Sequence, residues 1–73
     1  MTLHEVLKKF HTGQFEIVSN RTENRLIDCR IDYYNVVSAM EYNEHNTDKL
    51  ILELADREVD IIDLDNMTII VED

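Results

Sequence analysis

The chain has 73 residues with one cysteine, one glycine and no proline, and 44% of its residues are hydrophobic. This composition predicts a folded chain, at a length close to the minimum for a self-sufficient hydrophobic core. Sixteen acids against seven bases give a net charge of −9, which argues against direct binding to nucleic acid or to an anionic membrane, because the phosphates would repel the protein.

We expect one compact domain over residues 1–73. Cys29 is the lone cysteine, so the chain forms no internal disulfide. The opening segment MTLHEVLKKF lacks the apolar run of a signal peptide, and no stretch has the ~20 apolar residues that cross a bilayer. These features predict a soluble, cytoplasmic protein.

Residues 3–11 are predicted to form a helix. Thr2 is a good N-cap, and Glu5 three residues later completes a capping box. Apolar residues then recur at helical spacing, at Leu3, Val6, Leu7 and Phe10. Gly13 is placed to end the helix in a left-handed conformation.

Two strands are predicted next, over residues 14–19 and 25–31, joined by the polar loop 20–24 into an antiparallel hairpin. Alternation places Phe15 and Ile17 on one face of the first strand. In the second strand, Cys29 alternates with polar neighbours and shares a face with Ile27 and Ile31, so we expect its thiol in the core.

A second helix is predicted over residues 32–42, where Tyr33, Val36, Val37 and Met40 have helical spacing. Residues 50–55 leave two alternatives. As a strand, Leu50, Leu52 and Leu54 alternate; as a helix capped by Thr47 or Asp48, the buried stripe is Leu50, Ile51 and Leu54. Leu, Glu and Ala favour the helix slightly.

The chain ends in a predicted hairpin, with strands over residues 58–64 and 67–72 and a turn at Asp65–Asn66. This register pairs Ile62 with Ile69, Ile61 with Ile70 and Asp60 with Val71. Both faces of the hairpin then carry apolar pairs, so one face needs a second cover, and a homodimer is one way to supply it.

Together these elements predict an α+β fold. The N-terminal helix and the second helix pack on a small antiparallel sheet of about four strands. The expected core contains the helical stripe together with Phe15, Ile17, Ile27, Ile31, Ile62 and Ile69.

The charge is unevenly distributed. Residues 41–73 hold eleven acids and two bases, whereas residues 1–40 hold five of each. A run of acids is usually a solvated face, and acids on a final strand also block aggregation at its edge. Solubility would be served as well by spreading the acids out, so the one-sided concentration keeps a binding surface open beside that interpretation. Tyrosine beside charge is typical of interfaces. The predicted partner-binding residues are Glu41, Tyr42, Glu44, Asp56, Glu58, Asp60, Asp63 and Asp65.

Catalysis, cofactors and metals have little support in the sequence. There is no glycine-rich phosphate loop and no zinc-type spacing of cysteine and histidine. Asp63, Asp65 and Asn66 lack the glycine of a helix-loop-helix calcium site. We therefore predict no enzyme activity, no catalytic residue, no cofactor and no metal site, and keep calcium or magnesium binding as a minor third reading.

The stretch EVDIIDLDNMTIIVE, after a capped N-terminal helix and the strand FEIVS, resembles small acidic proteins encoded by phages and mobile elements of Gram-positive bacteria. Some of those are anti-CRISPR or other anti-defence proteins. The resemblance implies the host cytosol as the compartment. Carboxylates at strand spacing mimic a row of phosphates. The leading hypothesis is thus a non-catalytic inhibitor that occupies a basic surface, such as the nucleic-acid-binding groove of a nuclease. The alternative is a phage or bacterial accessory module without inhibitory activity, either monomeric or homodimeric.

Overall fold

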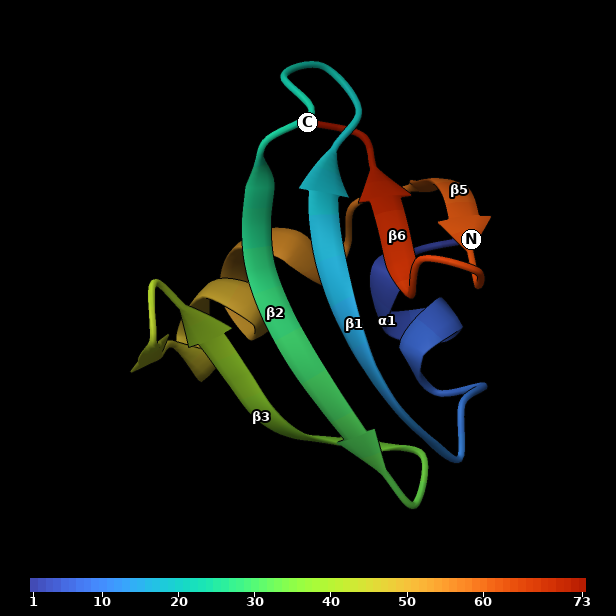
Figure 1. Cartoon of the computed structure of the whole chain (residues 1–73), viewed down its shortest axis with the longest axis vertical. Helices are drawn as coiled ribbons and strands as arrows, with labels where there is room; N and C mark the ends of the chain where they lie inside the picture. Colours follow the sequence, from blue (N-terminus) through green and yellow to red (C-terminus); the bar gives the residue numbers. More distant parts are fainter.

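The computed structural model describes all 73 residues, and it consists of one six-stranded sheet with two short helical segments. The strands lie in the order β4-β3-β2-β1-β6-β5 (Figure 1). The elements in chain order are α1 (Leu3–Leu7), β1 (Thr12–Ser19), β2 (Arg25–Asp32), β3 (Asn35–Glu41), β4 (Glu44–His45), η1 (Lys49–Leu54), β5 (Val59–Asp63) and β6 (Thr68–Val71).

The sheet is mixed. Strands β1 to β4 follow one another as antiparallel neighbours, and β5 pairs antiparallel with β6. The last strand, β6, lies between β1 and β5 and runs parallel to β1. The predicted α+β arrangement of two helices on about four antiparallel strands is therefore wrong: the protein is mostly β, and its first and last strands are neighbours.

The predicted second helix over residues 32–42 is also wrong, because most of it forms β3. Tyr33 and Tyr34 make a tight turn that returns β3 alongside β2, with Ile31 opposite Val36 and Cys29 opposite Ala39. Helical spacing of apolar residues was present, but β-branched valines suit a strand better. The Tyr-Tyr turn has none of the glycine or asparagine that marks a hairpin in a sequence.

Segment α1 confirms the predicted start and corrects the predicted end. Thr2 and Glu5 form the capping box, and the Thr2 hydroxyl accepts from the Glu5 N–H at 3.3 Å. The helix ends after one turn and a half, and Gly13 lies inside β1 without a left-handed conformation. A Cβ built on Gly13 would lie 2.6 Å from the Phe15 ring, so the glycine leaves room for that ring.

The helix alternative for residues 50–55 is confirmed, with bounds shifted by one residue: η1 covers Lys49–Leu54, and Ala55 is its C-cap. Its first turn is held by Asn46, whose side-chain oxygen accepts from the Lys49 N–H at 3.2 Å, while Asp48 makes no capping bond. Leu50 and Leu54 are buried, but Ile51 is 59% exposed, contrary to the predicted stripe. Neither α1 nor η1 has the length and apolar character that a membrane-spanning helix needs.

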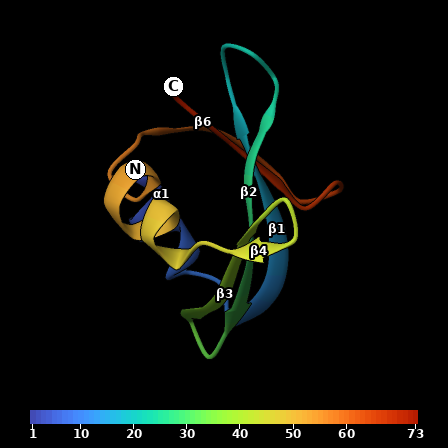
Figure 2. The same cartoon turned by 90° about the vertical axis from the view of Figure 1, so that its left-hand side faces the viewer.

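The core lies between one face of the sheet and the two helical segments, which Figure 2 shows together on the same side. The central strands confirm the predicted pattern, with Phe15, Ile17, Ile27, Ile31 and Ile69 all buried. Cys29 is buried among them, and burial raises the pKa of its thiol to about 12, which disfavours the thiolate form.

The final hairpin keeps most of its predicted register. Ile62 pairs with Ile69 and Ile61 with Ile70, as expected. A bulge between Val59 and Ile61 puts Val59, not Asp60, opposite Val71. Ile62 is 44% exposed because β5 is the edge strand, so its predicted place in the core is wrong.

Two hairpin turns contain tyrosine in the left-handed region. Tyr33 and Tyr34 have φ of 49° and 64°, and Tyr42 has φ of 50° beside Asn43. Bulky residues rarely adopt this conformation. At the first turn the His11 ring contacts both tyrosines edge-on, with centroids 5.2 and 5.1 Å away, and these contacts offset part of the strain.

Removing one methyl group from the centre of the core is expected to lower stability measurably. Ile69→Val should reduce the free energy of unfolding by about 1 kcal/mol, because Ile69 is fully buried beside Ile17. Ile61→Val, in the same hairpin but half exposed, is the matched control and should change stability by less than about 0.5 kcal/mol. Urea titration of the two variants gives the comparison, and equal effects would contradict the assigned register.

Removing the backbone strain of the left-handed tyrosines is expected to stabilise the protein by different amounts at the two turns. Replacing Tyr42–Asn43 with Asn-Gly should add about 1 kcal/mol to the free energy of unfolding. The same replacement at Tyr33–Tyr34 should add less, because it also removes the contacts with His11. Thermal melts of the two double variants test this, and an equal gain would show that the His11 contacts contribute nothing.

Candidate functional site

The sheet order divides the predicted binding residues into two groups at opposite edges. Glu41, Tyr42 and Glu44 belong to the β3–β4 hairpin, whereas the remaining acids lie in or around β5. Strands β3 and β5 are separated by four strand spacings, or about 19 Å. The eight residues therefore do not form one continuous surface.

The group around β5 contains both free and engaged carboxylates. Asp56, Asp60 and Asp65 are exposed and make no ion pair. Glu58 pairs with the amino group of Met1. Asp63 holds the β5–β6 turn: its carboxylate accepts from the Asn66 side chain at 2.8 Å and from the Asn66 N–H at 3.3 Å, and these bonds lower its pKa.

In the group on the β3–β4 hairpin, Glu41 is engaged in bonds within the fold, whereas Tyr42 and Glu44 are free. The Glu41 carboxylate accepts hydrogen bonds from the Lys49 ammonium and the Asn46 amide, and both lower its pKa. These bonds tie β3 to the start of η1. Tyr42 is 78% exposed at the turn, and Glu44 is exposed beside it.

On the sheet face opposite the helices, Asp63, one of the predicted binding residues, meets two acids that were not predicted, Glu16 and Asp28. Asp63 lies opposite Thr68, Thr68 beside Glu16, and Glu16 opposite Asp28. Because directly opposed residues share a face, Glu16, Asp28 and Asp63 stand in one row across β2, β1, β6 and β5. We call these three residues the acidic row. Glu16 and Asp28 come from the half of the chain that has no net charge.

An apolar row runs beside the acidic row on the same face. Ile61 lies opposite Ile70, and Ile70 is the parallel partner of Val18. Ile61 is 51% exposed, and Ile70 and Val18 are half-buried. Both helical segments lie on the other side of the sheet (Figure 2), so nothing in the chain covers these two rows.

The C-terminal residue holds β6 in place. The buried Ser19 hydroxyl donates to the Asp73 carboxylate at 2.9 Å, and Arg57 donates to the other carboxylate oxygen. Arg21 adds an ion pair at 3.9 Å. These partners, Ser19 first, lower the pKa of Asp73. These bonds connect the end of β1 and the residue before β5 to Asp73, just after β6, and we call them the Asp73 anchor.

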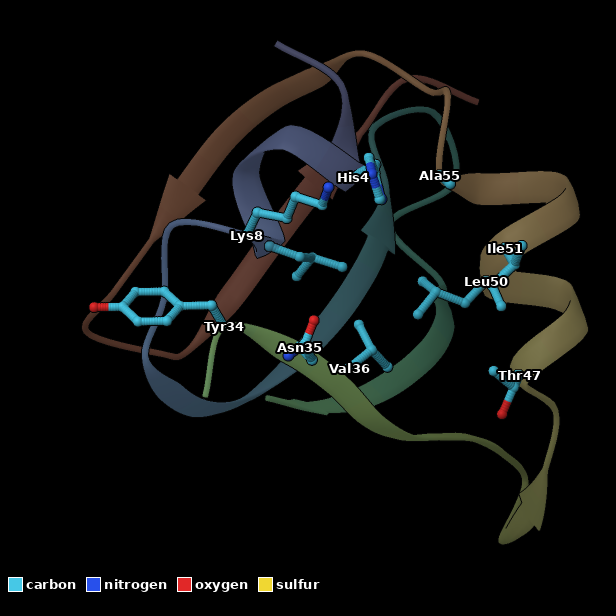
Figure 3. Close-up of a pocket in the computed structure, with 10 residues that line it drawn as sticks. His4, Lys8, Tyr34, Asn35, Val36, Thr47, Leu50, Ile51 and Ala55 are labelled. Atoms are coloured by element: carbon cyan, nitrogen blue, oxygen red, sulfur yellow. The ribbon is translucent and has the colours of Figure 1, made fainter. Parts of the chain in front are cut away.

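A pocket of about 210 Å³ opens on the helix side, between α1, the start of β3 and η1 (Figure 3). Ten residues line it, and none is acidic: His4, Leu7, Lys8, Tyr34, Asn35, Val36, Thr47, Leu50, Ile51 and Ala55. Its floor is apolar, with Leu7 and Leu50 buried.

No group of three or more histidine, cysteine, aspartate or glutamate side chains is arranged to hold a metal ion. The minor calcium or magnesium reading therefore has no set of ligands in this fold. No protein-family model, curated protein or solved structure was found to match the chain.

Acidification is expected to weaken the Asp73 anchor. Because the pKa of Asp73 is lowered in the folded state, its contribution is present above the ordinary value of 3.8 and is lost as pH falls through the lower folded value. Asp73→Asn should thus destabilise the protein at pH 7, and the difference from wild type should shrink below about pH 4. Asp65→Asn, which removes a carboxylate that makes no ion pair, is the control.

Thermal melts from pH 7 to pH 2 measure both differences. A difference between wild type and Asp73→Asn that stays constant over this range would contradict the assigned anchor.

Proposed function

We propose that this chain is a non-catalytic binding protein whose uncovered sheet face docks onto a basic surface of a partner protein. The observation that carries the proposal is the acidic row, in which strands of the uncovered sheet face hold an exposed Glu16 in line with the half-buried Asp28 and Asp63. The free acids Asp56, Asp60 and Asp65 extend the negative surface around the β5 edge. The net charge of −9 adds long-range attraction toward a positive partner.

The pairing of Glu16 with Asp28 supports a binding role. Like charges directly opposite each other in an antiparallel pair destabilise a sheet. Arg25, which lies 3.2 Å from the Asp28 carboxylate, offsets this repulsion for only one of the two acids. A partner that places a cation over the row would neutralise Glu16, the acid that Arg25 does not pair with. Binding would then relieve the repulsion between Glu16 and Asp28, and that relief would make the free energy of binding more favourable.

The apolar row supplies the other component of a protein interface. A dehydrated apolar centre beside a charged rim is the usual arrangement, and Val18, Ile61 and Ile70 lie next to the carboxylates in this way. A second copy of the chain fits the face less well than a basic partner, because two copies would each bring a net charge of −9.

A basic groove that otherwise holds nucleic acid is the partner surface we favour. Glu16 and Asp28 stand on neighbouring strands about 4.8 Å apart, and Asp63 stands two strands from Glu16 with Thr68 between them. The three carboxylates therefore form a line of negative charge across the sheet toward side chains arranged for phosphates. The resemblance to small acidic phage proteins agrees with such an inhibitory role.

Charge reversal at Glu16 separates binding from folding. Glu16→Lys should raise the free energy of unfolding by about 0.5 kcal/mol, because an attractive pair with Asp28 replaces a repulsive one. The same variant should lose partner binding. Glu53→Lys on the helix side makes an equal change in net charge at an exposed site and should keep binding.

The binding test uses wild type and both variants, each immobilised and exposed to a nucleic-acid-binding protein fraction from a Gram-positive bacterium. We expect wild type and Glu53→Lys to retain the same protein, which is released by raised salt and by added double-stranded DNA. Glu16→Lys should retain none of it. Equal retention by all three, or release by neither salt nor DNA, would refute the proposal. Size-exclusion chromatography of the free protein reports any homodimer.

A further inference from the structure

The helix-side pocket differs in character from the rest of the molecule. The chain carries sixteen acids, yet none of them lines this pocket. Six of its ten lining residues are hydrophobic, and its two basic residues are His4 in α1 and Lys8, the C-cap residue that directly follows α1. The pocket lies on the side of the sheet away from the acidic row, and the proposed partner surface therefore leaves it open.

His4 and Lys8 stand one helical turn apart, and the Lys8 N–H donates to the His4 carbonyl at 3.3 Å. Residues at this spacing share one face of a helix. Figure 3 shows both side chains extending from α1 on one side of the pocket, with Leu50 and Ile51 on the opposite side. Lys8 makes no ion pair, so its ammonium is free to meet a ligand.

The size of the pocket limits what it holds. An apolar cavity of about 150 Å³ accommodates benzene, so a pocket of about 210 Å³ takes an apolar group of similar or slightly larger size. Its apolar floor favours a ring or a short alkyl chain. Lys8 and His4, which lie at one side, favour a negatively charged head group on that ligand.

We infer that this pocket binds a small anionic amphiphile: one carboxylate or phosphate group attached to an apolar chain of about six carbons. The apolar part lies on Leu7, Val36 and Leu50, and the anionic group meets Lys8 and His4. The inference concerns a surface separate from the acidic row, and it stands or falls independently of the proposed partner.

Four six-carbon probes test the inference: hexanoate, hexyl phosphate, 1-hexanol and hexylammonium. They share the chain and differ in the charge of the head group. Each is titrated into the whole protein, and NMR follows the backbone amides of Leu7, Val36 and Leu50 against those of Glu16 and Ile70 on the other sheet face. The net charge of −9 by itself favours hexylammonium, so a preference for an anion reports the local charge of the pocket.

We expect hexanoate, hexyl phosphate or both to shift the pocket amides and to bind at least about three-fold more tightly than 1-hexanol. Lys8→Gln should remove that preference and leave 1-hexanol binding unchanged. Lys9→Gln is the matched control, because Lys9 is an exposed neighbour that does not line the pocket. The tighter of the two anions identifies a carboxylate or a phosphate ligand.

The inference is overturned if hexylammonium or 1-hexanol binds as tightly as both anions. It is also overturned if the shifts fall outside the pocket, or if Lys8→Gln and Lys9→Gln bind hexanoate equally well. Both substitutions are at exposed positions and leave the buried face of α1 intact. A thermal melt of each variant separates a loss of binding from a loss of fold.

Discussion

The parallel pairing of β1 with β6 is the contact on which the rest of the structure depends. Ile17 on β1 lies between Ile27 and Ile69, and all three are almost completely buried. Without this pairing the β5–β6 hairpin would have no sheet to join, and an isolated hairpin is at best marginally stable. The Asn20 N–H donates to the Val71 carbonyl at 2.9 Å, and the Asp73 anchor continues the contact beyond the strand ends.

The same pairing separates charge on the molecule. It brings Asp63 from the C-terminal hairpin into line with Glu16 and Asp28 on the uncovered face. On the other side, α1 and η1 enclose a pocket whose rim is basic. The acidic row and the pocket that has His4 and Lys8 at its rim therefore lie on opposite sides of one sheet, where screening by water and salt limits the electrostatic influence of each on the other.

Part of the candidate site was predictable, and part was not. Local alternation indicated that Glu16 faces away from the core, since it stands between Phe15 and Ile17. It gave no sign that Asp28 and Asp63 are its neighbours, because that depends on a register between strands far apart in the chain. Glu41 is the reverse case. It was predicted to bind a partner together with the other acids, but in the fold its carboxylate accepts hydrogen bonds from Lys49 and Asn46.

The sequence by itself determined the capped first turn of α1, the buried faces of β1 and β2, the core position of Cys29 and the central pairs of the final hairpin. Each of these follows from spacing within a short segment, where a period of two or 3.6 residues specifies a face. Only the tertiary structure decided that Asn35–Glu41 is a strand, that β6 enters beside β1 and which carboxylates meet. Those outcomes depend on which pairing of distant strands buries the most apolar surface. The spacing of residues within a short segment does not determine which distant strands pair.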